Sequence, residues 1–260
     1  MPKLAANLSM MFNEVDFMDR FGAAAEAGFK GVEYLFPYDF PAEQIAEQLE
    51  KHGLKQVLFD FTAGDFAGGE RGIAIQPERQ GEFQDGVGTA LEYAKVLGCE
   101  RLTVLAGLAP DGVDRGTLQQ TLVENLKFAA AEAAPHGINV LLEPLNTVDA
   151  PKFFVVHTKD ALATIEAAGS PSNLKLQYDV YHMQIMEGDL HRAIDANIGS
   201  IGHIQIADNP GRHEPGTGEI NYTNLLKHID DAGYEGWIGC EYIPAGETAA
   251  GLSWASNYLS

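Results

Sequence analysis

The chain has 260 residues, of which 45% are hydrophobic, and this is enough apolar material for one large core. The 37 acidic residues against 17 basic ones set a formal charge of -20, which would repel a nucleic-acid backbone and an anionic membrane. We therefore expect a small-molecule substrate, no nucleic-acid partner and no membrane partner. The sequence leaves open whether the protein forms a homo-oligomer.

Two further exclusions concern compartment and redox chemistry. The N-terminal residues MPKLAANLSMMFNE lack the apolar core of a signal peptide, and no segment approaches the run of about 18 apolar residues that spans a bilayer. We therefore expect a cytoplasmic protein. Cys99 and Cys240 are too few and too far apart in sequence for a disulfide framework or a thiolate metal site.

Strand-like apolar segments alternate with helical patterns along the whole chain. In chain order, each expected strand is followed by its helix: 4–8 and 15–27, 31–36 and 41–53, 54–61 and 77–97, 101–107 and 116–135, 138–142 and 158–168, 174–179 and 189–198, 201–209 and 222–232, 236–241 and 248–258. The second helix shows the usual asymmetry of helix ends, with Pro41 at its start and Gly53 at its end. A long Gly-rich loop, residues 62–76, separates the third strand from its helix.

Eight strand–helix pairs with this spacing require parallel crossovers, which favours a single (β/α)8 TIM-barrel domain over residues 1–260. An open doubly wound sheet is the alternative, because the segment AGGERG offers some glycine-rich character. That segment lacks the G-x-G-x-x-G spacing of a dinucleotide-binding loop and does not open a helix at once. The barrel is therefore the predicted fold.

Oxygen-bearing side chains lie at or near the ends of four consecutive expected strands, and chemistry in a barrel takes place at that rim. These side chains are Glu143, Asp179, Gln205 and Glu241. Each alone is most often a solvated strand end, whereas four together suit a hard cation, Mg²⁺ or Mn²⁺, and suit zinc poorly. The cation would also explain why the apolar strand INVLL ends in a charge, at Glu143.

A divalent cation between these carboxylates suggests proton transfer next to a carbonyl group, with an enediolate stabilised by a Lewis acid. Glu143 and Glu241 would then remove and return the proton as catalytic residues. His182 follows Asp179 by three residues and could donate a hydrogen bond to a substrate oxygen. The alternative for His182 is a purely structural contact in a loop.

Five motifs resemble those of the hydroxypyruvate isomerase family of xylose isomerase-like barrels, and the resemblance covers essentially the whole chain. They are AGDFAGGERGIA (63–74), EPLN (143–146), YDVYH (178–182), HIQIADNPGRHEPGTGEI (203–220) and GCEY (239–242). The resemblance implies interconversion of hydroxypyruvate and tartronate semialdehyde.

The family's functional residues fall on positions already singled out. The resemblance implies that Glu143 and Glu241 are the catalytic pair. It also implies a metal site made of the following ligands: Glu143, Asp179, Gln205 and Glu241. Substrate contacts are implied at His182 and Arg212. Ketose 3-epimerases of the superfamily usually have histidine where this chain has Gln205, which disfavours that alternative, whereas isomerases of 2-oxo-tetronate stay open.

Two arginines are candidates for binding the carboxylate of an acidic substrate. Arg212 lies in the loop after the seventh strand, and Arg71 lies in the long loop after the third. Either guanidinium could bind a carboxylate with two parallel hydrogen bonds. The alternative for both is a surface pair with one of the many acidic residues.

Two other classes of function stay as alternatives. A barrel endonuclease acting on abasic DNA would need more histidine ligands and a basic groove, which a charge of -20 disfavours. A non-catalytic sugar-binding barrel would have no need for two glutamates at separate strand ends.

Overall fold

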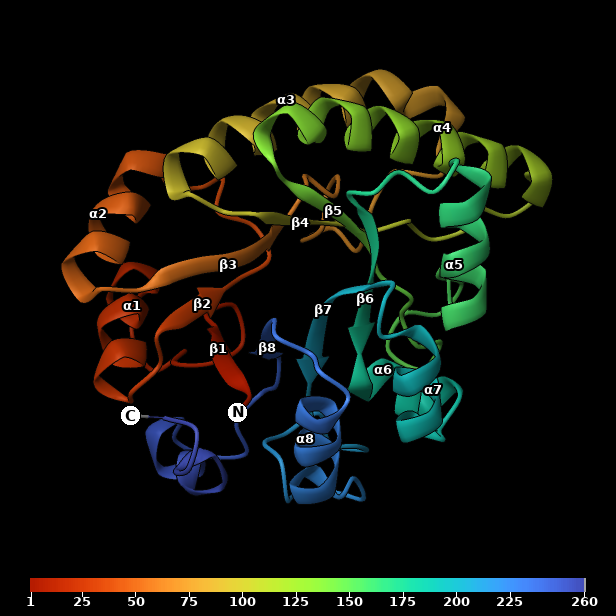
Figure 1. The fold of residues 1–260 in the computed structure, drawn as a ribbon. Helices are drawn as coiled ribbons and strands as arrows, with labels where there is room; N and C mark the ends of the chain where they lie inside the picture. The colour runs from red at the N-terminus through yellow and green to blue at the C-terminus, as the bar shows by residue number, and fades with distance from the viewer. Residues whose placement is uncertain (260) are drawn as a thin grey trace.

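Eight parallel strands close into a barrel in the computed structural model, which describes residues 1–259 (Figure 1). Each strand pairs with the next in sequence, and β8 pairs with β1 to complete the ring. The strands are β1 (Lys3–Asn7), β2 (Gly31–Glu33), β3 (Lys55–Asp60), β4 (Arg101–Val104), β5 (Asn139–Leu142), β6 (Leu174–Asp179), β7 (Ile201–Ile206) and β8 (Trp237–Cys240). The predicted (β/α)8 fold is confirmed.

Helices surround the barrel and carry the chain from the end of one strand to the start of the next (Figure 1). They are α1 (Phe17–Glu26), α2 (Ala42–His52), η1 (Pro77–Arg79), α3 (Gln80–Leu97), α4 (Arg115–Ala133), η2 (Ala134–His136), α5 (Thr158–Ala167), α6 (Val180–Met186), α7 (Leu190–Asn197), α8 (Tyr222–Asp231) and η3 (Ala249–Ala255). None of the helices within residues 1–259 has the length and apolar character to cross a membrane.

The structure corrects two of the expected elements. The sixth strand ends at Asp179 as expected, but α6 begins at the next residue, where a loop was expected. The cause is local, because the Asp179 side chain accepts a hydrogen bond from the backbone N–H of Tyr181 at 2.8 Å and so caps the new helix. The terminal helix expected over 248–258 is instead the shorter 3-10 helix η3.

The interior of the barrel changes from apolar to polar along its axis. Its apolar part is a separate buried cluster with a half-buried tryptophan against it: Ala5, Val57, Leu58, Leu141 and Trp237. A polar layer follows toward the carboxyl ends of the strands. It is made of these buried side chains: Asn7, Glu33, Gln177, His203 and Gln205. Gly239 makes room for this layer, because a Cβ atom there would come within 2.3 Å of the Glu33 carboxylate.

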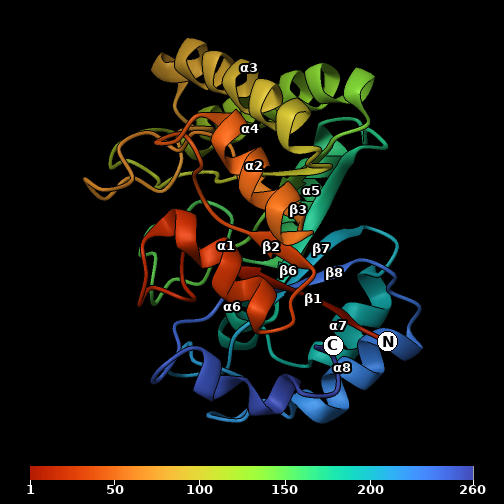
Figure 2. The ribbon, with the colours of Figure 1, turned by 90° about the vertical axis from the view of Figure 1, so that its left-hand side faces the viewer.

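The loops that follow the strands form the rim opposite the N-terminus, and the longest of them runs from β3 to η1 (Figure 2). Glu70 holds this loop together by accepting hydrogen bonds from the backbone N–H of Asp65 at 2.6 Å and from Arg79 at 2.5 Å. Gly72 has a φ of +100°, and a Cβ there would lie 2.0 Å from the carbonyl oxygen of Leu105. The loop therefore packs directly on the end of β4.

Candidate active site

A cavity of about 250 Å³ opens at the carboxyl ends of the strands. Its wall carries the following side chains: Met10, Leu35, Asp60, Phe66, Arg71, Leu105, Glu143, Leu145, Asp149, Ala150, Gln177, His182, Arg212 and Glu241. The volume suits a small solute, and the wall mixes apolar side chains with a few converging charged groups, as ligand sites do. Most of the candidate residues from the sequence meet at this cavity.

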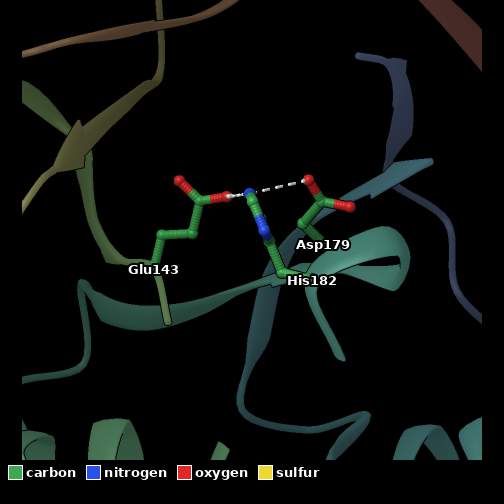
Figure 3. A group of neighbouring side chains, drawn as sticks. All are labelled: Glu143, Asp179 and His182. Atoms are coloured by element: carbon green, nitrogen blue, oxygen red, sulfur yellow. Dashed lines mark ion pairs between the residues drawn. The ribbon is translucent and has the colours of Figure 1, made fainter. Parts of the chain in front are cut away.

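Glu143, Asp179 and His182 form one buried cluster (Figure 3). Nε2 of His182 lies 3.5 Å from Oδ2 of Asp179 and 4.0 Å from Oε1 of Glu143. Those two carboxylate oxygens are buried and have no hydrogen-bond partner. Buried carboxylate oxygens without a partner are costly, so this cluster is suited to binding a cation or a hydrogen-bond donor of a ligand.

Helix α6 carries His182 into this cluster. The sequence placed the residue just past a strand end, in a loop, whereas it lies in the first turn of the helix that Asp179 caps. The two side chains are three residues apart and therefore face the same side. The helix that begins directly after β6 is what brings the imidazole to the cavity.

Glu241 follows β8 directly and is held from two sides. Arg212 donates to its Oε1 at 2.6 Å. The amides of Asn7 and Gln205 donate to its Oε2, the former at 3.3 Å. The carboxylate therefore has partners in the barrel interior and at the rim.

Gln205 lies behind the cavity wall, in the polar layer of the barrel. Its Nε2 donates to Glu33 at 2.8 Å and to Glu241, while its Oε1 accepts a hydrogen bond from Gln177 at 2.6 Å. Ligation of a cation by the Gln205 oxygen, as predicted from the sequence, would require a half-turn of this amide. In the structure, the amide nitrogen of Gln205, and not its oxygen, faces the carboxylate of Glu241.

Arg212 is positioned by a loop that a single aspartate organises. Asp208 is fully buried and accepts four backbone N–H groups, from Asn209, Gly216, Gly218 and Ile220 at 2.8–3.1 Å. Arg212 itself has a φ of +53°. Its guanidinium lies 2.6 Å from Glu241 and 3.8 Å from Asp179, so it joins the acidic cluster.

Arg71 reaches the cavity from the long loop after β3. Its guanidinium stacks on the Phe66 ring, 4.2 Å from the centroid, and donates to the carbonyl oxygens of Phe66 and Glu70 at 3.1 and 2.7 Å. It is therefore tied to its own loop on the cavity wall, whereas Arg212 is tied to the acidic cluster.

The buried environment shifts the pKa values of the cluster. Burial and the neighbouring carboxylate of Glu241 raise the pKa of Glu143 well above its usual range. Burial raises the pKa of Glu241 to about 8 and that of Asp179 to about 6, although Arg212 opposes both shifts. Burial and the nearby guanidinium lower the pKa of His182 well below its usual range, which favours the neutral imidazole.

The donor set fits a divalent cation. Ligand atoms of Glu143, Asp179 and His182 lie within 4.8 Å of one another, and two of them are the unpartnered carboxylate oxygens. Carboxylate oxygens are the ligands that Mg²⁺ and Mn²⁺ prefer.

Three residues of the site were not singled out from the sequence: Asp60, Asn146 and Gln177. Asp60 ends β3 and lines the cavity, so the rule applied to the other strand ends would have found it. Gln177 precedes Asp179 by two residues and therefore shares its face of β6. Asn146 lies within the EPLN motif, but nothing in the sequence pairs it with His182.

The closed (β/α)8 barrel and the polar cavity at the carboxyl ends of its strands define the class of protein. The chain belongs to the xylose isomerase-like TIM barrel family, whose model matches residues 21–258. It is 50% identical to a 2-oxo-tetronate isomerase of Cupriavidus necator over 100% of this chain and 99% of that protein. It is 48% identical to a hydroxypyruvate isomerase of Escherichia coli over 99% of this chain and 100% of that protein. The chain is therefore an enzyme of the isomerase type.

A solved structure is similar over its whole length. A crystal structure from Brucella melitensis, described as an AP endonuclease of family 2, is 50% identical with a TM-score of 0.98 and 100% of both chains covered.

Proposed function

We propose that the protein isomerises a short 2-oxo acid, with hydroxypyruvate as the first candidate and tartronate semialdehyde as its product. The observation that carries this proposal is the pair Glu143 and Glu241, two buried carboxylates on one small cavity, where burial raises the pKa of Glu143 well above its usual range and that of Glu241 to about 8. General acid–base groups work best when their pKa lies near the working pH. The kinship with isomerases supports the same reading.

The proposed reaction moves one proton between neighbouring carbons. One of the two glutamates, as the carboxylate, takes the proton from C3 of hydroxypyruvate, and the C2 carbonyl becomes part of an enediolate. The other glutamate, as the acid, delivers a proton to C2, and the hydroxyl proton of O3 passes to O2, so that C3 becomes an aldehyde and C2 carries a hydroxyl group. They follow β5 and β8, which are not neighbouring strands of the barrel, so we expect the two carboxylates to approach the substrate from different directions.

Two further side chains would bind the substrate. Arg212 supplies the positive charge for the substrate carboxylate, and its planar guanidinium can form two parallel hydrogen bonds with that group. His182 lies between Glu143 and Asp179, where an imidazole N–H can donate to a substrate oxygen. Arg71 is the second candidate for the carboxylate, since it lines the same cavity.

A divalent cation completes the proposed site. Glu143, Asp179 and Glu241 would hold Mg²⁺ or Mn²⁺, together with Gln205 once its amide oxygen faces the cavity side. When bound, the cation supplies Lewis-acid stabilisation of negative charge on the substrate oxygens.

A second candidate substrate is the longer acid 2-oxo-tetronate. A 2-oxo-tetronate isomerase activity is the alternative, because the relative from Cupriavidus necator carries that name and covers the whole chain. A ketose 3-epimerase is disfavoured by Gln205, because epimerases of the superfamily usually have histidine at this position. The two arginines that line the cavity, Arg71 and Arg212, favour an acidic substrate in either case.

DNA cleavage is not proposed, although the structure from Brucella melitensis carries an endonuclease description. A chain with a charge of -20 repels a phosphate backbone, and the cavity of about 250 Å³ is suited to a small solute.

A substrate comparison tests the proposal. The purified protein with Mg²⁺ or Mn²⁺ is incubated in D₂O with hydroxypyruvate, 2-oxo-tetronate or a neutral ketose of similar length. Proton NMR follows product formation and exchange of the C3 hydrogens for deuterium. We expect turnover of at least one 2-oxo acid at a higher kcat/KM than the ketose. Absence of both turnover and exchange with all three compounds would contradict the proposal.

A further inference from the structure

We propose that Asn146 is a positioning residue that holds the proton of the His182 imidazole on Nε2, so that this ring donates a hydrogen bond into the cavity. The inference rests on the isomerase function proposed above, because it gives His182 its role toward the substrate. It concerns a contact on the far side of the ring from the cluster in Figure 3.

The first step concerns the atoms around Nδ1 of His182. The backbone N–H of Asn146 donates to Nδ1 at 3.2 Å, and the side-chain Nδ2 of the same residue lies 2.7 Å from it. A backbone N–H can only donate, so Nδ1 must offer its lone pair. A neutral imidazole then carries its one proton on Nε2.

The second step fixes which end of the Asn146 side chain faces the ring. Its Oδ1 accepts hydrogen bonds from the backbone N–H groups of Val148 and Asp149 at 2.9 and 2.8 Å. Its Nδ2 also donates to Oδ2 of Asp149 at 3.1 Å, and Tyr181 donates to the same oxygen at 2.8 Å. A reversed amide would set its oxygen against the Asp149 carboxylate and its NH₂ against two N–H donors.

Burial makes this arrangement compulsory. Asn146 is fully buried and His182 is 3% exposed. Water therefore cannot readily replace either residue as the hydrogen-bond partner of the other. Asp149 and Tyr181 therefore orient Asn146, and Asn146 orients the imidazole. Side chains that orient an active-site histidine through its second nitrogen in this way determine its tautomer.

The third step concerns the opposite nitrogen. Nε2 faces Oδ2 of Asp179 at 3.5 Å and Oε1 of Glu143 at 4.0 Å, both acceptors. Arg212 also approaches Nε2, at 3.5 Å, and a guanidinium would prefer a lone pair there. That contact is at the outer limit of a hydrogen bond, whereas Nδ1 has two donors at 2.7 and 3.2 Å. The Nδ1 side therefore decides where the proton lies.

The position of His182 alone would allow it either to ligate a cation or to donate a hydrogen bond. A protonated Nε2 permits only the second role. A nitrogen that ligates a metal must have a free lone pair, so His182 does not act as a ligand in this tautomer, although it lies among the ligand atoms of Glu143 and Asp179. It also cannot accept a proton at Nε2. The ring is left as a neutral donor aimed at the cavity, where it would stabilise negative charge developing on a substrate oxygen.

The direct test reads the tautomer by ¹⁵N NMR on the full-length protein labelled in its histidines and supplied with diamagnetic Mg²⁺. His182→Gln identifies the signals of this ring. We expect the wild type to show a protonated Nε2 and an unprotonated Nδ1. A wild-type ring that carries its proton on Nδ1 would overturn the proposal.

A charge-matched variant tests the role of Asn146 itself. The double substitution Asn146→Asp with Asp149→Asn exchanges an amide and an acid, so the net charge is unchanged. At Nδ1 of His182, a carboxylate oxygen, which accepts, replaces the amide nitrogen, which donates. We expect the proton to move to Nδ1 and kcat to fall at least about 10-fold, because one donor to the developing charge is lost. The control is the same exchange on an exposed helix face, Asn224→Asp with Asp231→Asn, which should change neither the tautomer nor kcat.

A third variant separates orientation from packing. Asn146→Ser removes the side-chain donor but keeps the backbone N–H, so the tautomer should stay at Nε2 and kcat should fall less than in the exchanged pair. If the exchanged pair keeps the Nε2 proton and wild-type kcat, Asn146 does not position the ring. The tautomer is read without substrate, so failure of the proposed isomerase function would appear in the turnover assay and not in this measurement.

Discussion

The guanidinium of Arg212 lies 2.6 Å from Oε1 of Glu241 and 3.8 Å from Oδ2 of Asp179. One side chain therefore neutralises two of the carboxylates that we propose as cation ligands. A like charge so close to a cation opposes its binding, because two unit charges at about 4 Å interact by about 4 kcal/mol at an effective dielectric constant near 20. Arg212 is thus expected to weaken cation binding while it strengthens binding of an anionic substrate.

The first prediction concerns cation affinity. Arg212→Ala should bind Mn²⁺ about 10-fold more tightly than the wild type, since the competing positive charge is removed. Isothermal titration calorimetry without substrate measures the effect. Arg71→Ala is the matched control, because that arginine is tied to its own loop and should leave the Mn²⁺ affinity unchanged. Weaker Mn²⁺ binding by Arg212→Ala would show that the ion pair organises the ligands.

The second prediction concerns the substrate carboxylate. Arg212→Ala should raise KM for hydroxypyruvate about 10- to 150-fold, because a charge-assisted contact contributes about 1.5–3 kcal/mol. The loss for a neutral ketose should be far smaller. Arg212→Lys should recover only part of it, since an ammonium lacks the planar fork. Equal losses for acid and ketose would make Arg71 the leading candidate for the carboxylate.

The third prediction concerns the two glutamates. Glu143→Gln and Glu241→Gln should each lose at least about 100-fold in kcat, because an amide keeps the shape but cannot accept or deliver the proton. Circular dichroism and thermal unfolding check that both variants remain folded. Glu132→Gln on the exposed face of α4 is the control substitution. Near-wild-type turnover in either variant removes that residue from proton transfer.

The fourth prediction concerns the cation. Protein treated with a chelator and shown by elemental analysis to be free of divalent metal should be inactive. Mg²⁺ or Mn²⁺ should restore turnover, since the proposed ligands are hard oxygens, and Zn²⁺ should restore it poorly. Full activity after verified removal of the metal would rule out the cation-assisted enediolate scheme.

The fifth prediction concerns stability against pH. Burial raises the pKa of Glu241 to about 8 and that of Asp179 to about 6, against ordinary values near 4 in the unfolded chain. The folded protein therefore binds more protons than the unfolded chain over this window, and its free energy of unfolding decreases as pH rises from about 4 to about 8.

Thermal unfolding in chelator at pH 5, 6, 7 and 8 measures this dependence. We expect Tm to fall over the series, and to fall less in Glu241→Gln, which has no proton to lose at that position. Saturating Mg²⁺ or Mn²⁺ should reduce the slope further, because a bound cation favours the ionised carboxylates. An identical slope in the wild type and in Glu241→Gln would contradict the raised pKa of Glu241.

The repeat of strands and helices could be recognised in the sequence because it depends on local periodicity and on residues such as Gly53 that end helices. The candidate residues at strand ends followed from the rule that barrel chemistry takes place at the carboxyl ends of the strands. Glu143 and Glu241 indeed line one cavity, and Asp179 belongs to the buried cluster with Glu143. Their roles as catalytic residues and ligands stay predictions. The end of β6 at Asp179 was expected, but His182 was placed in a loop and not in a helix, because the helix is capped by the Asp179 side chain.

What the sequence determined by itself is the order of elements and the strand from which each polar side chain projects, since both follow from short-range pattern and chain direction. Only the tertiary structure decided how those side chains face one another. The nitrogen of Gln205 points to Glu241, Arg212 pairs with the acidic cluster, and Asn146 meets His182 from 36 residues away. Such contacts depend on donor and acceptor geometry between separate strands and loops, which no local pattern encodes.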